Sequence, residues 1–234
     1  MRRIFLDTET TGLNADGGDR VIEIGCIEMV GRQLTGDHRH YYLNPQRASH
    51  PEALRVHGLT EEFLADKPLF AAIVDELLAY LAGAELVIHN AAFDVGFLDR
   101  ELERCGRLGV AAGVAQITDS LLLARELYPG KSNSLDALCK RLEVDNSNRT
   151  LHGALLDAGL LAEVYIGMTR GQGSLVIDEA ETRDADGAVE AIDLSAFDLP
   201  ELPPSAAELA AHRSLLADID KACRGKLVWQ ADLA

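Results

Sequence analysis

The chain has 234 residues, a hydrophobic fraction of 47% and a formal net charge of −16 at pH 7. Its length supports one well-formed core with an additional segment. The apolar runs are too short to suggest a membrane span, and the four scattered cysteines suggest neither a zinc site nor a disulfide framework. We therefore expect a cytoplasmic protein without a membrane partner. The negative charge argues against tight unaided binding of nucleic acid, because such binding depends on Lys and Arg side chains that neutralise phosphates.

The N-terminal part of the chain predicts three strands. Residues 2–9, RRIFLDTE, combine β-branched and aromatic side chains and lead into a Thr-Thr-Gly turn. The segments VIEIGCIEMV and QLTGDHRHYYL follow the glycine pair at 17 and 18. We expect both segments to be antiparallel partners of the first strand.

Helices dominate the next part of the chain. Residues 68–83 have apolar side chains at helical spacing between a proline and a glycine. The segment ELVIH at 85–89 predicts a short buried strand, and residues 91–106 predict an amphipathic helix that ends at Gly106. This order predicts an α/β fold, a mixed sheet flanked by helices. Further helices are predicted at SLLLARELY, SLDALCKRL and HGALLDAGLLAEVYIGM.

Beyond Thr169 the composition changes. Residues 171–205 are rich in Gly, Asp, Glu and Pro and predict a flexible linker, and nine acidic residues against one basic residue lie within 178–205. Residues 206–234 begin with renewed helical periodicity. A single amphipathic helix after a solvated linker does not bury its apolar face alone, so we expect it to dock on a partner.

Two acidic residues stand at the end of the first predicted strand. Because strand side chains alternate in direction, Asp7 and Glu9 project from the same face. Neighbouring carboxylates repel each other, and a bound cation would relieve that repulsion. A solvated strand face is the simpler interpretation of an isolated Asp-x-Glu. The apolar residues Ile4, Phe5 and Leu6 instead predict a strand buried on both faces, where an unpaired Glu would be costly.

Asp94 lies in the first turn of the helix that follows the strand ELVIH and the polar pair His89 and Asn90. Helix capping explains an acidic residue at this position on its own, because a carboxylate interacts well with the helix dipole. Phe93 beside it fits a core position, a base-stacking position or both. The residue types alone leave these alternatives open.

His152 and Asp157 lie five positions apart, which separates them by about 140° around a regular helix. The two side chains converge only if His152 lies in the entry loop or the first turn, and Gly153 favours that arrangement. An imidazole in such a place can orient and deprotonate a water molecule at neutral pH. A structural role is the alternative for an isolated histidine.

Taken together, LDTETTGL, HNAAFDVGFLDRE and HGALLDA resemble, in order and spacing, the three motifs of the DEDD exonuclease superfamily. The pattern HxAxxD marks the histidine-bearing DEDDh branch. Residues 2–177 are further similar to the proofreading epsilon subunits of bacterial DNA polymerase III. The resemblance implies a ribonuclease H-like fold with a mixed five-stranded sheet, a flexible C-terminal linker and a short docking helix.

The resemblance also implies a metal-dependent 3′–5′ exonuclease that releases nucleotides one at a time from a DNA 3′ end. Two Mg²⁺ or Mn²⁺ ions would be bound by Asp7, Glu9, Asp94 and Asp157, and His152 would act as general base, so that all five residues are catalytic. The residues that match positions of the nucleotide pocket in relatives are Thr10, Gly12, Leu13, His57, Asn90 and Phe93.

Partners follow from the same resemblance. The domain organisation would be an exonuclease domain at 1–170, a clamp-binding peptide and acidic linker at 171–205, and a polymerase-binding segment at 206–234. The glutamine-led peptide QGSLVI at 172–177 would bind the sliding clamp, and the start of the linker is the alternative interpretation of this segment. Two alternative functions stay open: a DEDDh exonuclease that acts on RNA ends, and a non-catalytic interaction subunit.

Overall fold

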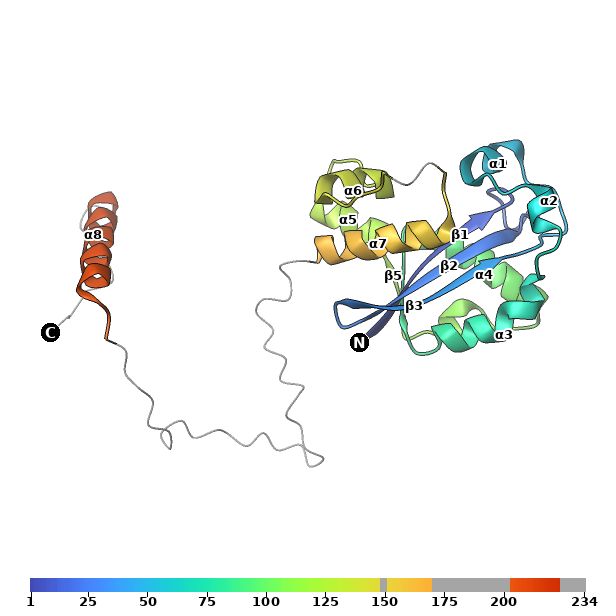
Figure 1. The fold of residues 1–234 in the computed structure, drawn as a ribbon, viewed down its shortest axis with the longest axis horizontal. Coiled ribbons are helices and arrows are strands. Elements are labelled where there is room, and N and C mark those ends of the chain that lie inside the picture. Colours follow the sequence, from blue (N-terminus) through green and yellow to red (C-terminus); the bar gives the residue numbers. More distant parts are fainter. Residues whose placement is uncertain (148–150, 170–202, 224–234) are drawn as a thin grey trace, which may run out of the picture. The chain divides into compact units, whose positions relative to one another are not determined.

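A computed structural model describes residues 1–147, 151–169 and 203–223 of the chain (Figure 1). The chain divides into two units, Met1–Val176 and Ile177–Ala234, and each is described by itself. The peptide at 172–177 and all but the last three residues of the predicted linker lie outside the described residues. The domain boundaries at 170 and 205 therefore stay predictions.

The first unit is built on one mixed sheet with the strand order β3-β2-β1-β4-β5. The pairs β1–β2 and β2–β3 are antiparallel, whereas β1–β4 and β4–β5 are parallel. The predicted mixed five-stranded sheet is thus confirmed. The strands are β1 (Arg2–Thr10), β2 (Val21–Val30), β3 (Gln33–Tyr42), β4 (Glu85–Ile88) and β5 (Gln116–Asp119).

Two details of the sheet differ from the sequence analysis. β3 pairs with β2 and not with β1, because β1 uses its other edge to pair with β4. The position of β5 was not predicted. This edge strand has only four residues, QITD, and none of them is fully buried, so its sequence lacks the apolar run that marks β4.

The predicted helices are all present, and they are shorter by a few residues than their sequence patterns. Two short helices, α1 and α2, were not predicted. α1 begins at a proline and ends before Gly58, whose left-handed φ of 72° favours a residue without a Cβ. The helices of this unit are α1 (Pro51–His57), α2 (Glu61–Leu64), α3 (Phe70–Leu81), α4 (Ala91–Arg104), the 3₁₀ helix η1 (Val110–Ala112), α5 (Ser120–Leu127), α6 (Leu135–Leu142) and α7 (Ala154–Met168).

Helices cover both faces of the sheet, with α3 and α4 on one side and α6 and α7 on the other (Figure 1). The pleat of β1 sends Ile4 and Leu6 into the core that contains α3 and α4, and it sends Phe5 into the core that contains α6 and α7. All three side chains are fully buried, as the sequence predicted. β1 is therefore packed between the two helical layers, and this packing fixes the position of its end.

The described part of the second unit is the helix α8 (Ala206–Ala222). It begins with a capping box in which Ser205 and Glu208 exchange hydrogen bonds between side chain and backbone. Leu215 and Ile219 are exposed on this helix. The predicted amphipathic helix is present, and its docking on a partner stays a prediction. Within residues 1–147, 151–169 and 203–223, no helix has the length and apolar character to cross a membrane.

Candidate active site

One cavity of about 720 Å³ is lined by all five side chains of the acidic and histidine motifs. Asp7 and Glu9 come from the end of β1, Asp94 from the first turn of α4, and His152 and Asp157 from the start of α7. Because β4 runs parallel to β1, the helix that follows β4 begins beside the end of β1. The sheet topology thus brings motifs that are far apart in sequence to one place.

The side chains of β1 alternate in direction, so its polar residues face two different helical layers. Thr8 faces the α4 layer, and its hydroxyl donates a hydrogen bond of 2.7 Å to Asp94 Oδ1. Asp7 and Glu9 point to the opposite face, toward the layer that contains α7. The end of the strand therefore places a donor against one carboxylate and supplies two further carboxylates itself.

Asp94 carries the clearest electrostatic signal in the cavity. The residue is only 4% exposed, and burial raises the pKa of its carboxyl to about 7, although the hydrogen bond from Thr8 acts in the opposite direction. Helix capping alone does not call for such burial, since a capping carboxylate is normally solvated. A charge held here needs a positive partner, and a divalent cation with oxygen ligands fits this requirement.

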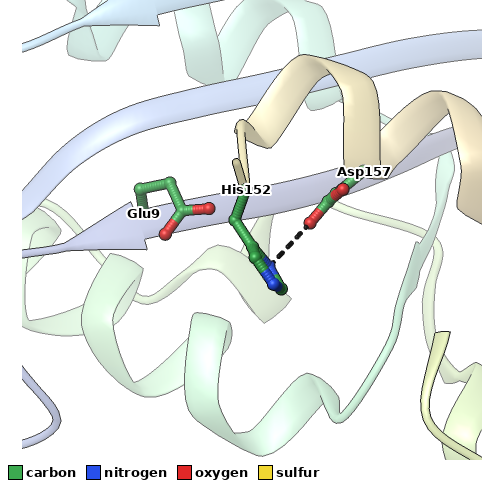
Figure 2. A group of neighbouring side chains, drawn as sticks. All are labelled: Glu9, His152 and Asp157. Carbon is green, nitrogen blue, oxygen red and sulfur yellow. Dashed lines mark ion pairs between the residues drawn. The ribbon is translucent and has the colours of Figure 1, made fainter. Parts of the chain in front are cut away.

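Glu9, His152 and Asp157 form a compact group with a donor set suited to a metal ion (Figure 2). One ligand atom from each residue lies within 4.8 Å of the others. His152 Nδ1 lies 3.3 Å from Asp157 Oδ2, and the imidazole lies between the two carboxylates in this view. His152 stands in the loop just before the helix, with Gly153 as N-cap, which is the arrangement that the five-residue spacing requires.

The start of α7 is held against β2 by a close backbone contact. Gly25 pairs with Asp7 in the sheet, and a Cβ at this position would lie 2.2 Å from the backbone nitrogen of Leu155 and 2.3 Å from the carbonyl carbon of Ala154. Only a glycine allows this approach. Gly25 therefore sets the distance between β1 and the residues that α7 contributes to the cavity.

The turn before α4 orients the other side of the cavity. Asn90 has a left-handed backbone conformation with φ of 69°. The Asp119 carboxylate accepts hydrogen bonds from the backbone N–H groups of Asn90 and Ala91, and it also caps α5. One carboxylate thus fixes the turn that leads to Phe93 and Asp94.

Of the six positions predicted for the nucleotide pocket, two shape a turn, three line cavities at the site, and His57 is buried at the end of α1. Thr10 and Gly12 shape the turn after β1, because the Thr10 hydroxyl donates to the Gly12 carbonyl at 2.6 Å and a Cβ on Gly12 would meet His50 and Asp19. Leu13, on the same turn, is 84% exposed. It lines a neighbouring cavity of about 860 Å³ together with Asn90 and Phe93.

Asn90 and Phe93 also line the catalytic cavity, so they stand where the two cavities meet. Phe93 packs on Phe97 with ring centroids 4.9 Å apart and belongs to the edge of the core. It therefore takes part in the core and in the cavity wall, as the sequence left open.

His57 is buried at the end of α1, and burial lowers its pKa. Its Nδ1 accepts a hydrogen bond of 2.9 Å from the Leu59 N–H, which leaves the proton on Nε2. That buried Nε2 has no hydrogen-bond partner among the described residues. A buried donor of this kind is an unsatisfied polar group that a ligand oxygen would satisfy.

Three positioning residues were not predicted from the sequence. Thr8 stands inside a predicted strand, and its contact to Asp94 spans 86 positions, so no local pattern reveals it. Gly25 looks like an ordinary strand glycine until α7 is in place. Asp119 follows the segment QIT and precedes Ser120, and an acidic residue directly before a helix is a recognisable N-cap signal.

Comparison with known proteins identifies the family. The exonuclease family model matches residues 4–165. The chain is 49% identical over 241 residues to DNA polymerase III subunit epsilon of Pasteurella multocida, which covers 100% of this chain and 95% of that protein. It is 50% identical over 238 residues to the subunit of the same name from Escherichia coli, with 98% of each protein covered.

A solved structure of Exonuclease X in complex with 5′-overhanging duplex DNA has a TM-score of 0.54 and 26% identity, and the match covers 71% of this chain and 90% of that chain. Exonucleases of this fold use divalent metals, and the carboxylate and histidine group described above has a suitable donor set. The chain therefore belongs to the exonuclease family and, within it, to the epsilon subunits of DNA polymerase III, the 3′–5′ exonucleases that proofread DNA synthesis.

Proposed function

We propose that Asp7, Glu9, Asp94 and Asp157 bind two divalent cations, Mg²⁺ or Mn²⁺, for hydrolysis of the 3′-terminal phosphodiester of DNA. The observation that carries this proposal is the group of Glu9, His152 and Asp157, which lines the same cavity as the other two carboxylates. Bound cations of this kind stabilise negative charge on a phosphoryl oxygen and lower the pKa of water. The buried carboxyl of Asp94 supports the assignment, because its ionised form needs a cation nearby.

His152 acts as the general base in this proposal. Its Nδ1 lies toward Asp157, and a proton on Nδ1 places the accepting lone pair on Nε2. The exposed position of the ring gives it access to water. His152 thus takes a proton from the attacking water while the carboxylates keep their charge.

The nucleotide that is removed occupies the space beside Leu13, His57, Asn90 and Phe93. The orphaned Nε2–H of His57 supplies a hydrogen-bond donor, and Phe93 supplies an aromatic ring for the base. Thr10 and Gly12 act through the turn that they shape. Exonuclease X was solved with duplex DNA, which supports DNA as the substrate of the related cavity.

The chain works as a subunit of a DNA polymerase in the cytoplasm. Its relatives carry the name DNA polymerase III subunit epsilon over almost their whole length. We assign the polymerase catalytic subunit as the partner of residues 206–234 and the sliding clamp as the partner of residues 172–177. The exposed apolar residues of α8 fit a docking role, and a linker between the two units would replace intrinsic DNA affinity by high effective concentration.

The decisive experiment is digestion of a 3′-mismatched primer by the full chain with Mg²⁺ or Mn²⁺, beside a matched primer. The variant Asp7→Ala should fold normally and lose nuclease activity, whereas a non-catalytic interaction subunit would be unaffected by the change. DNA and RNA oligonucleotides of the same sequence separate the proposed activity from that of an exonuclease for RNA ends. Faster turnover of RNA would contradict the proposal.

A further inference from the structure

Two basic side chains line the catalytic cavity and have no role in the proposed hydrolysis. Arg125 lies near the end of α5, and Lys131 lies in the loop between α5 and α6. Both are exposed, and neither forms a salt bridge within the part of the chain that the structure describes. By contrast, Arg100, Arg104 and Arg107 are all paired with carboxylates.

The loop that carries Lys131 is braced from two sides. Arg141 donates hydrogen bonds to the Ser132 carbonyl at 2.8 Å and to Asn133 Oδ1 at 3.1 Å. Its guanidinium also lies 4.7 Å from the ring centroid of Tyr128. From the other side, His89 Nε2 lies 3.0 Å from the Asn133 carbonyl oxygen. The loop is therefore a fixed part of the cavity wall.

A DNA strand brings more negative charge into this cavity than the proposed cations neutralise. The terminal nucleotide is joined to the strand by the single phosphate that is cleaved. Every other phosphate belongs to the 5′ side of the strand, and it enters a cavity in a chain of net charge −16. Asp136 on the same wall is itself held by Asn146 at 3.2 Å. Basic side chains without acidic partners are the groups that offset this repulsion.

We propose that Arg125 and Lys131 bind backbone phosphates of the DNA strand on the 5′ side of the cleaved bond. The ligand class is a phosphodiester chain with at least two phosphates, and this inference rests on the proposed function of the cavity. The two side chains are positioning residues, because they touch the strand and not the reacting atoms. Their charge compensates locally for the acidity of the whole chain.

The test compares two substrates of the full chain with Mn²⁺ or Mg²⁺. An aryl ester of thymidine 5′-monophosphate has the cleavable phosphate and no 5′ strand, whereas a single-stranded oligonucleotide has both. Lys131→Gln and Arg125→Gln should each raise KM for the oligonucleotide about tenfold, and KM for the ester should change less than twofold. The slope of log KM against log salt should fall by about 0.7 for each lost phosphate contact.

Two further variants control for charge and folding. Lys140→Gln removes an exposed charge on α6 that does not line the cavity, and it should leave both KM values unchanged. Lys131→Arg keeps the charge and should retain the oligonucleotide KM of the parent chain.

The outcomes separate the inference from the proposed function. An equal rise in KM for both substrates, or an unchanged oligonucleotide KM and salt slope in both Lys131→Gln and Arg125→Gln, overturns the inference and leaves the proposed function intact. A parent chain that hydrolyses neither substrate with either cation overturns both. Selective loss on the oligonucleotide, with rescue by Lys131→Arg, supports the phosphate-binding wall.

Discussion

The two sides of the catalytic cavity are built differently. On the side of β1 and α4, Asp94 is buried between core layers and bound by Thr8. On the side of α7, the Asp157 side chain is buried, whereas 45% of the His152 side chain is exposed and the histidine stands outside the helix. The difference matches the two tasks, because cation ligands need a fixed geometry before binding, whereas a proton acceptor needs access to water.

The buried side is tested by Asp94→Asn, for which we expect the largest effect. The amide keeps an oxygen acceptor for Thr8 and removes the charge. Nuclease activity should fall below detection, a larger loss than removal of a general base causes. Without metal, the variant should be more stable than the parent chain by about 2 to 4 kcal/mol at pH 8, because the buried carboxylate no longer has to ionise.

The pH dependence of that difference gives the control. The pKa of Asp94 is raised to about 7, so its ionisation costs folding free energy that is fully present above pH 7 and absent below the ordinary carboxyl pKa. Denaturant unfolding in a chelator should therefore show the gain shrinking as pH falls from 8 to 4. A gain that is independent of pH would mean that charge burial is not its cause.

The exposed side is tested by His152→Ala. Turnover should fall by about 10² to 10⁴, the usual range for a lost general base, because water then has no proton acceptor beside it. Metal affinity, measured by calorimetry, should stay within a few-fold of the parent value, since the four carboxylates remain. The matched control is His38→Ala on β3, an exposed histidine outside the lining of the catalytic cavity. Loss of metal binding in His152→Ala would make the histidine a ligand.

Much of this arrangement was predictable from the sequence. The pleat of β1 and the helical spacing of α3 and α4 are local periodicities, so the strands and most helices follow from them. The convergence of the acidic motifs was also expected, although through resemblance to a known family, because each motif alone has an ordinary structural explanation.

The remaining features depend on tertiary contacts. β5 has no apolar run because it lies at the sheet edge. Two contacts connect segments that lie far apart in the sequence, so local periodicity does not predict them. They are the hydrogen bond from Thr8 to Asp94 and the approach of Gly25 to Ala154. Such contacts determine how well the carboxylates are held, and they are invisible until the layers are packed.

The contact between the two sides is tested by Gly25→Ala. A Cβ at 2.2 Å from the backbone of Leu155 cannot be accommodated, so the start of α7 must shift away from β2. We expect activity to fall about 100-fold, because misplacement by about 1 Å has this effect on aligned groups, and stability to fall by about 1 to 3 kcal/mol. The control is Gly159→Ala within α7, where a Cβ meets no heavy atom within 4 Å. This change should keep activity and raise stability by about 0.5 to 1 kcal/mol.

The smallest effect is expected for Thr8→Val, which tests how much the buried side owes to one hydrogen bond. The substitution keeps the shape of the side chain and removes the hydroxyl that donates to Asp94 at 2.7 Å. That bond favours the ionised carboxylate, so its loss should raise the pKa of Asp94 further and weaken metal binding. We expect metal affinity at pH 7 to fall about 10-fold, the lower end of the range for lost outer contacts of a metal site. Because the missing hydrogen bond acts through protonation of Asp94, the loss of metal affinity should be smaller when the metal titration is repeated at pH 9. A deficit of equal size at both pH values would show that Thr8 acts by packing alone.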